Sequence, residues 1–175
     1  MYTKFLISII IILVIIVYVN YYTNYKKDYN ILQTYLDNID LSLVYEKYPI
    51  VIYDRVINPS ELIKTLFAYS YIYKKQYSIK GPFNPMINTS KHAIIWCPSD
   101  DIILNIINPK FKNNFKWEKK VSTLSLKDID NSSVQYITIK LKKNQVLILP
   151  AFWIFDSTNT INIIQLDDLL SFFTT

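Results

Sequence analysis

The sequence has very little glycine, cysteine, histidine or arginine. Among its 175 residues each of these four types occurs once, as Gly81, Cys97, His92 and Arg55. Phosphate-binding loops of the P-loop and Rossmann types require several glycines, so the glycine content excludes both classes of nucleotide-binding enzyme. A single cysteine cannot form an internal disulfide, and folding therefore does not depend on an oxidising compartment.

Positive charge is in excess but is scattered along the chain. The formal net charge is +5 and the isoelectric point is near 9.1. Arginine is the residue favoured for paired hydrogen bonds to bases and phosphates, and Arg55 stands alone. We therefore expect no nucleic-acid partner. Solvated surfaces explain most of the lysines, and weak attraction to an anionic membrane surface is the next interpretation.

An apolar segment near the N-terminus is the strongest signal in the sequence. Residues Phe5–Val19 read FLISIIIILVIIVYV, with one serine and no charge. With Tyr21 and Tyr22 the segment reaches about 18 residues, near the lower limit for crossing a hydrocarbon core of roughly 30 Å. Tyrosines at its far end suit the headgroup layer. We predict a transmembrane anchor over residues 1–23, with membrane-embedded positions that include Phe5, Leu6, Ile10, Leu13, Ile16 and Val19.

Other interpretations of this segment have less support. A cleaved signal peptide usually ends in small residues, whereas the sequence after the run, VNYYTNYKKD, contains neither alanine nor glycine. An amphipathic helix is not indicated, because residues 9–19 leave no polar face. The flanking charges nearly tie, with Lys4 before the run and Lys26 and Lys27 after it, partly offset by Asp28. We favour a cytosolic domain, since it needs no disulfide.

The rest of the chain divides into a linker and one domain. Residues 24–43 are mixed in polarity and predict a short amphipathic stalk helix, with apolar positions at helical spacing: Ile31, Leu32, Tyr35, Leu36 and Ile39. Residues 44–175 are long enough to form one core. Within them, Pro49–Tyr53 predicts a strand. The sequence Asn58-Pro59-Ser60-Glu61 predicts the start of a helix over about 59–70, with a capping residue followed by proline.

Short apolar runs punctuated by turn residues dominate from His92 onward. Residues 134–141 alternate between apolar and polar side chains, as in a half-buried strand. Several short strands at this spacing are typical of a sandwich or barrel. We therefore predict a mainly β fold with a few helices. The tyrosine-rich segment 69–77 is our candidate for an exposed patch that contacts other proteins.

The stretch from Ile137 to Phe155 resembles the second conserved block of cupin-like (JmjC-type) hydroxylases. That block is a strand, a turn, and an apolar strand ending in proline, followed by two residues, tryptophan, one residue and histidine. Pro150 and Trp153 match it, and Pro49–Ile52 with the helix after it resembles the opening of such domains. The resemblance implies a double-stranded β-helix, or jelly-roll, domain. Membrane-anchored versions of this fold occur in nucleocytoplasmic large DNA viruses, which implies a viral membrane or virion protein.

The sequence departs from this family at the metal site. The family's distal iron-binding histidine falls at Phe155 here, and its proximal ligands fall near Trp96 and Pro98. An Fe(II) facial triad needs two histidines and a carboxylate, and the chain has only His92. We therefore expect no metal, no cofactor and no enzymatic activity. We also expect Trp153 and Phe155 to pack in the core and to fill the former pocket.

Other candidate residues have simpler explanations. His92 with Asp100 or Asp101 is a candidate metal or acid–base pair, although a histidine at the surface or at a strand edge is more common. Cys97 and His92 are five residues apart and would point to opposite faces of a strand. Asp167-Asp168 could hold a cation or cap a helix. Two triplets fit the N-glycosylation pattern, although such triplets are frequent by chance in an asparagine-rich chain; they begin at Asn88 and Asn131.

These observations favour a non-catalytic single-pass membrane protein with a structural or interaction role in a viral or virus-modified membrane. The expected partners are the lipid bilayer and other membrane or virion proteins, with no nucleic acid and no small-molecule substrate. An Fe(II)/2-oxoglutarate hydroxylase and a cupin that binds a small ligand are the alternatives. A well-formed apolar pocket would favour the ligand-binding alternative, whereas a packed interior would remove it.

Overall fold

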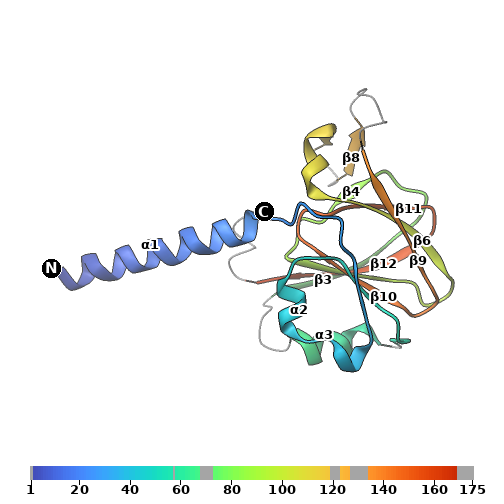
Figure 1. Ribbon diagram of the computed structural model, residues 1–175, viewed down its shortest axis with the longest axis horizontal. Helices are drawn as coiled ribbons and strands as arrows, with labels where there is room; N and C mark the ends of the chain where they lie inside the picture. Colours follow the sequence, from blue (N-terminus) through green and yellow to red (C-terminus); the bar gives the residue numbers. More distant parts are fainter. Residues whose placement is uncertain (1, 57, 68–72, 119–122, 127–133, 169–175) are drawn as a thin grey trace.

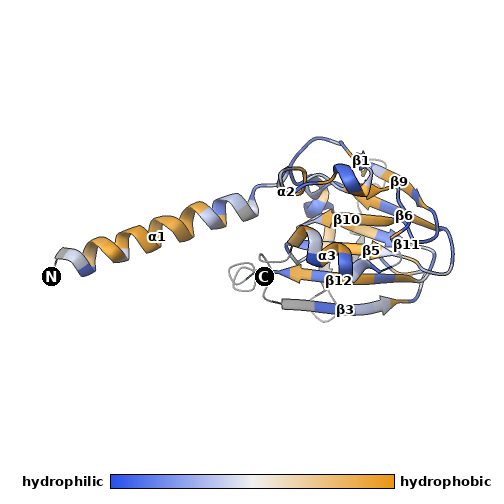
Figure 2. Cartoon of the chain, turned by 90° about the horizontal axis from the view of Figure 1, so that it is seen from below, coloured by the Kyte–Doolittle hydropathy of each residue, from blue (hydrophilic) through white to orange (hydrophobic). Residues whose placement is uncertain are grey.

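The computed structural model describes residues 2–56, 58–67, 73–118, 123–126 and 134–168. Helix α1 (Tyr2–Thr23) stands clear of the β-rich domain as a long rod (Figure 1). At about 1.5 Å per residue it extends about 33 Å, compared with roughly 30 Å for a hydrocarbon core. Its window Thr3–Tyr21 is long and apolar enough to span a membrane, and none of it is buried. Figure 2 shows that the apolar colouring continues along most of α1 and ends before the domain.

The domain consists of two six-stranded sheets. In spatial order, the first sheet contains β1 (Leu32–Thr34), β2 (Ile50–Ile52), β10 (Val146–Pro150), β5 (His92–Trp96), β12 (Ile161–Asp167) and β3 (Tyr73–Ile79). The second contains β7 (Phe115–Glu118), β8 (Thr123–Leu126), β4 (Met86–Ile87), β11 (Ile154–Ser157), β6 (Ile102–Ile107) and β9 (Tyr136–Leu141).

Successive strands cross between the two sheets, as in a jelly roll. Strand β10 belongs to the first sheet, β11 to the second and β12 to the first again. The neighbouring strands pair antiparallel, apart from β1 and β2, which pair parallel. This arrangement confirms the predicted mainly β, cupin-like fold with an apolar N-terminal helix.

The central strands of the first sheet are buried on both of their faces. On β5, Ala93 and Ile95 point into the core between the sheets, while Ile94 and Trp96 point to an outer core. Helices α2 (Leu41–Tyr45) and α3 (Pro59–Phe67) cover that outer side. Because both faces are covered, β5 and β10 are apolar at nearly every position and do not alternate.

The second sheet has a more conventional pattern. On β6, Ile102, Leu104 and Ile106 are fully buried in the core between the sheets, while Ile103 points away from it and is exposed. Part of the outer face is covered by a smaller apolar cluster beside the 3₁₀ helix η2 (Pro109–Asn114), in which Phe115 and Ile154 are buried. The alternation predicted for residues 134–141 appears in β9, where Ile139 and Leu141 are buried and Lys140 is exposed.

Helix α3 begins as its capping sequence predicts. The side-chain oxygen of Asn58 accepts a hydrogen bond from the Ser60 backbone N–H at 3.0 Å, and Pro59 is the first helical residue. Leu62, Leu66 and Phe67 are buried against the first sheet. The helix is described as far as Phe67, and the last three residues of the predicted range, 68–70, lie outside the described residues.

The structure differs from the predicted helical stalk over residues 24–43. This segment contains β1, the short 3₁₀ helix η1 (Leu36–Asn38) and only the start of α2. Leu32 pairs with Ile50 of β2, so the segment forms the edge of the first sheet and belongs to the domain. The helical spacing misled the prediction because strand pairing with a distant segment outweighs local pattern. Asp40 caps α2 by accepting a hydrogen bond from the Leu43 N–H at 3.0 Å.

Candidate functional site

The Pro-x-x-Trp-x-Phe motif lies where the chain crosses from β10 to β11. Pro150 ends β10 and pairs with His92 of β5. Trp153 is fully buried between the sheets, and its indole N–H has no partner among the described residues. Phe155 points into the same core and meets Phe83 edge to face, with ring centroids 6.1 Å apart. The motif therefore supplies apolar core side chains.

Asn88 holds the loop between β10 and β11 in place. Its side-chain amide donates hydrogen bonds to the carbonyls of Leu149 and Pro150 at 2.9 and 3.0 Å. Its backbone pairs with the loop, donating to Trp153 and accepting from Phe152, whose φ is 68°. Because Asn88 is 1% exposed, its amide is inaccessible to a glycosyl donor in the folded protein. Asn131 lies outside the described residues.

The ligand positions of the resembled hydroxylases do not fit an iron ion. Phe155 carries no metal-binding atom. Trp96 points into the outer core beneath the helices, on the opposite side of the first sheet from Phe155. Across the described part of the chain, no group of three or more His, Cys, Asp and Glu side chains could hold a metal ion. A facial-triad oxygenase therefore lacks its ligands at these positions.

The structure does not bring His92, Asp100 and Asp101 together. His92 is the first residue of β5, whereas both aspartates lie in the turn beyond the opposite end of that strand. Asp100 is exposed, and Asp101 accepts a hydrogen bond from the Lys143 backbone N–H at 2.9 Å. The candidate cluster is therefore corrected: residues near in sequence are separated by the length of an extended strand.

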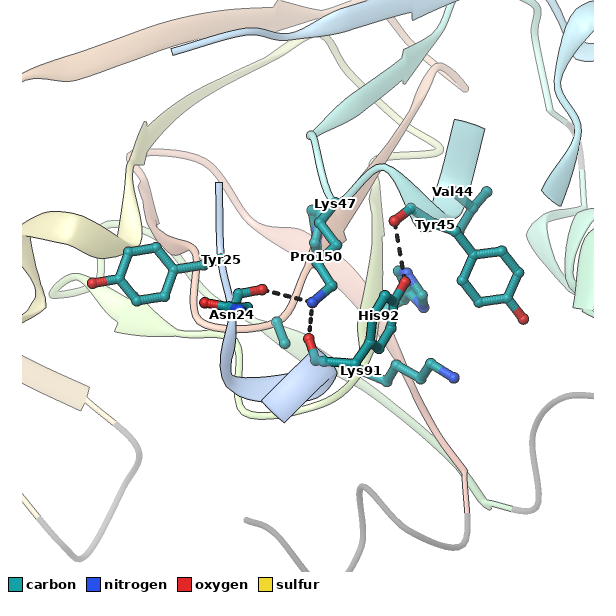
Figure 3. Close-up of a pocket in the computed structure, with 10 residues that line it drawn as sticks. Asn24, Tyr25, Val44, Tyr45, Lys47, Lys91, His92 and Pro150 are labelled. Carbon is teal, nitrogen blue, oxygen red and sulfur yellow. Dashed lines mark hydrogen bonds between the residues drawn. The ribbon is translucent and has the colours of Figure 1, made fainter. Parts of the chain in front are cut away.

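His92 is a buried, neutral packing residue. Its ring stacks on Phe67, with centroids 5.7 Å apart, and donates a hydrogen bond to the Val44 carbonyl (Figure 3). Burial, with the positive charge of Lys91 next, lowers the pKa of His92 to about 3. The imidazole therefore holds α2 against the first sheet and is uncharged at neutral pH.

Cys97 and the pair Asp167-Asp168 also have structural roles. Cys97 is buried in the inner core, 3.3 Å from the Ser99 hydroxyl, whereas His92 faces the outer core. Asp167 accepts a hydrogen bond from the Lys91 backbone N–H at 3.0 Å. Asp168 forms an ion pair with the Lys91 ammonium at 2.6 Å and accepts a hydrogen bond from the Tyr18 hydroxyl of α1. These carboxylates attach the end of β12 to its neighbours.

A cavity of about 500 Å³ remains at one end of the barrel, between the two sheets. Phe155 forms part of its wall and Ala93 lies at its first-sheet side. Apolar and aromatic side chains make up most of the lining: Tyr77, Ile79, Phe83, Met86, Ile87, Ala93, Phe155 and Ile163. The interior is thus not completely filled, in contrast to the packed interior expected from the sequence.

Among the described residues that line this barrel pocket there is one cation and no carboxylate. The ammonium of Lys75 lies 5.3 Å from the Tyr77 ring centroid, and Thr89 and Gln165 complete the polar lining together with Asn88. Burial raises the pKa of Tyr77, so its phenol remains protonated and able to donate a hydrogen bond. This lining suits a neutral or anionic molecule with an apolar body.

The position of Tyr77 is not consistent with the exposed patch predicted for the tyrosine-rich segment 69–77. Its side chain packs against the inner core and lines the pocket, so it does not face solvent as part of a patch. Residues 69–72 of the segment lie outside the described residues. A sequence signal for the pocket is a polar residue in alternation with inward-facing residues on two strands, Gln165 after Ile163 in β12 and Lys75 before Tyr77 in β3.

A second set of polar side chains gathers where α1 meets the domain. The Lys47 ammonium donates hydrogen bonds to the carbonyls of Tyr21 and, at 2.6 Å, Asn24 (Figure 3). It lies 3.9 Å from the Tyr21 ring centroid, and the Tyr21 hydroxyl donates to the Tyr45 carbonyl at 3.1 Å. A cation at this place satisfies carbonyls that the end of a helix leaves without partners. A cavity of about 20 Å³, room for about one water, lies beside it.

Comparison with protein-family models and with curated proteins finds no match for this chain. Comparison with solved structures finds a likeness to dTDP-4-dehydrorhamnose 3,5-epimerase from Elizabethkingia anophelis NUHP1. The identity is 9% and the TM-score is 0.32. The likeness covers 69% of this chain and 66% of the epimerase chain, so this chain spans slightly less than two thirds of the epimerase's length.

This likeness contradicts the prediction that the chain is not an enzyme, because the similar structure is itself an enzyme. The prediction extended the loss of one iron site to all catalysis, and the same type of fold supports many chemistries. At 9% identity and a TM-score of 0.32, the likeness assigns no reaction to this chain.

Proposed function

We propose that this protein is a single-pass membrane protein whose cupin-like domain binds a small amphipathic anion in the barrel pocket. The observation that carries the proposal is the cavity of about 500 Å³ with its mostly apolar lining. Small-molecule sites are typically about 300–1,000 Å³, mostly apolar, with a few polar groups that orient the ligand. The Lys75 ammonium supports an anionic group on the ligand, and the aromatic wall supports an apolar or aromatic body.

The membrane attachment rests on α1. None of its apolar window is buried in the domain, and placing that surface in a bilayer removes it from water. A helix that packed into a soluble core would be buried in the domain. Resistance of the full-length protein to extraction by alkaline carbonate is the expected result, and release into the soluble fraction would exclude a spanning anchor.

Binding in the barrel pocket can be tested with an aromatic acid and its neutral amide. The full-length protein is placed in phosphatidylcholine nanodiscs, and binding of 3-phenylpropionate and 3-phenylpropionamide is followed by ligand-observed saturation-transfer NMR. We expect the acid to bind more tightly than the amide. The Lys75→Gln variant should lose this preference, whereas Lys80→Gln, an exposed lysine outside the pocket, should retain it.

A second variant separates the pocket from the surrounding surface. Ala93→Leu places three additional carbon atoms in the cavity without removing charge, and we expect it to abolish binding of both compounds. Binding that survives Ala93→Leu, or an acid preference that Lys80→Gln removes as strongly as Lys75→Gln, would overturn the assignment to this pocket. Circular dichroism of each variant controls for folding.

A second candidate function is interaction with other proteins of a viral or virus-modified membrane. It is favoured by an exposed aromatic patch at the outer edge of the first sheet, next to β1. Tyr35 and Tyr53 are 58% and 41% exposed, with ring centroids 6.0 Å apart, and Leu36 beside them is 38% exposed. Edge strands and exposed aromatic groups are common features of protein interfaces. Failure of any membrane protein to co-purify in a Tyr35-dependent manner would count against this role.

A further inference from the structure

The fold collects lysines at the end of α1 that are far apart in the sequence. Lys26 and Lys47 line a groove of about 560 Å³ between the C-terminal end of α1 and the region of α2; Tyr21, Asn24, Ser42 and Tyr45 also contribute to it. Lys91 lies nearby, 5.7 Å from the Tyr45 ring centroid. We call this the juxtamembrane groove. The other end of α1 has only Lys4.

The lysines are close enough to affect one another. Burial, followed by the positive charges of Lys26 and Lys91, lowers the pKa of Lys47 to about 8. Two of the nearby carboxylates already have partners. Asp168 is paired with Lys91, and Asp28 accepts a hydrogen bond from Tyr48 at 3.4 Å. Among the described residues, the lining of the groove includes one carboxylate, Glu46, and two ammonium groups, those of Lys26 and Lys47. The groove is therefore net positive, and a bound anion would relieve the repulsion.

The negative end of the α1 dipole interacts with one of these lysines. Lys47 donates to the carbonyls of Tyr21 and Asn24, so its charge and the dipole partly offset each other. The Lys26 ammonium lies 5.3 Å from the Tyr48 ring centroid on an otherwise exposed side chain. Tyr45 also lines the groove, and its hydroxyl can donate a hydrogen bond, whereas the Ser42 hydroxyl already donates to Asp40 at 2.6 Å.

The position of the groove indicates which anion it meets. Tyr21 is the last residue of the apolar window and also lines the groove. If α1 spans the bilayer, as proposed above, the groove lies at the level of the lipid headgroups, where tyrosine rings and lysines are both favoured. A phosphate at this depth belongs to a lipid and is present at high local concentration.

We propose that the juxtamembrane groove binds the phosphate of an anionic phospholipid between Lys26 and Lys47. This inference depends on the membrane-spanning part of the proposed function and adds a second site to it. The lipid would fix the domain against the membrane surface, since the same lysine that receives the phosphate, Lys47, also holds the end of α1. The barrel pocket and the juxtamembrane groove share no lining residue.

The test uses full-length protein in nanodiscs that contain phosphatidylcholine with one fifth phosphatidylglycerol. Native mass spectrometry of the ejected protein counts the retained lipids of each type. We expect selective retention of phosphatidylglycerol, and Lys26→Gln should weaken it about fivefold, the effect of one lysine near an anionic surface. Lys27→Gln is the matched control, because it removes the same charge from the adjacent residue, which does not line the groove.

Three outcomes would overturn the inference. Equal losses in Lys26→Gln and Lys27→Gln would mean a diffuse surface attraction, and no lipid selectivity in the wild type would mean no site. Tight binding of inorganic phosphate in pure phosphatidylcholine nanodiscs, with the same dependence on Lys26, would assign the groove to free anions. Alkaline carbonate extraction of the same samples separates these results from failure of the anchor. Retained 3-phenylpropionate binding separates them from failure of the barrel pocket.

Discussion

Neighbouring residues on β5 face two regions with opposite packing. Ala93 points toward the barrel pocket, where a cavity of about 500 Å³ remains. His92, one residue earlier, points to the outer side of the first sheet, where it is stacked on Phe67 and hydrogen-bonded to Val44. Both regions are built on the same strands. Around His92 the outer side is therefore a packed structural core, whereas at Ala93 the inner side borders a cavity large enough for a ligand.

The largest effect on stability that we expect from this contrast involves two adjacent isoleucines of β12. Ile163 lines the barrel pocket and Ile164 packs in the outer core, and both are almost completely buried. Ile164→Ala should lower the free energy of unfolding by about 3–4 kcal/mol, because it creates a cavity in a packed region. Ile163→Ala should cost about 1–2 kcal/mol less, since its side chain already borders empty space.

Guanidinium unfolding of the two variants in detergent measures the difference, with the wild type as reference. Equal losses would show that the pocket wall is packed as tightly as the outer core. A larger loss for Ile163→Ala would reverse the comparison and remove support for a ligand cavity.

Acid provides a second test, because His92 is buried without charge. Its pKa is about 3 in the folded protein and near its ordinary 6.5 when unfolded. Between these values the unfolded state binds more protons, so stability is lost as the pH falls from 6.5 toward 3. The loss is about 1.4 kcal/mol per pH unit, or about 3 kcal/mol by pH 4.5.

Unfolding midpoints of the wild type and His92→Gln between pH 7 and 4.5 check this prediction. Gln cannot titrate, so the variant should be less stable at pH 7 but lose less stability on acidification. Parallel pH profiles would mean that carboxylates elsewhere cause the acid sensitivity and that His92 is accessible to protons in the folded state.

Local signals in the sequence predicted those features that local chemistry determines. The cap at Asn58 and Pro59 predicted the start of α3, and the apolar run predicted α1. The β-rich pattern and the Pro150–Trp153 motif predicted the jelly-roll fold. In each case neighbouring residues carry the information, through hydrogen bonds to nearby N–H groups or through the period of apolar positions.

Features that depend on distant partners were not predicted. The segment 24–43 was expected to be helical, but pairing of Leu32 with Ile50 makes it the edge of a sheet. The juxtamembrane groove joins Lys26 and Lys47 beside Lys91, which no sequence window contains. The barrel pocket depends on the volume left after packing, which a pattern of apolar residues does not fix.

The smallest expected effect on stability concerns the barrel pocket itself. Asn88 lines this pocket, and its side-chain amide already donates hydrogen bonds to backbone carbonyls. Asn88→Ala leaves the carbonyls of Leu149 and Pro150 without their amide partner, and we expect a loss of about 1–3 kcal/mol in the free energy of unfolding. Asn84→Ala, at an exposed position in the loop before β4, should change stability by less than about 0.5 kcal/mol. If Asn88→Ala is as mild as the control, water entering the pocket already satisfies these carbonyls, and the pocket is wetter than its apolar lining indicates.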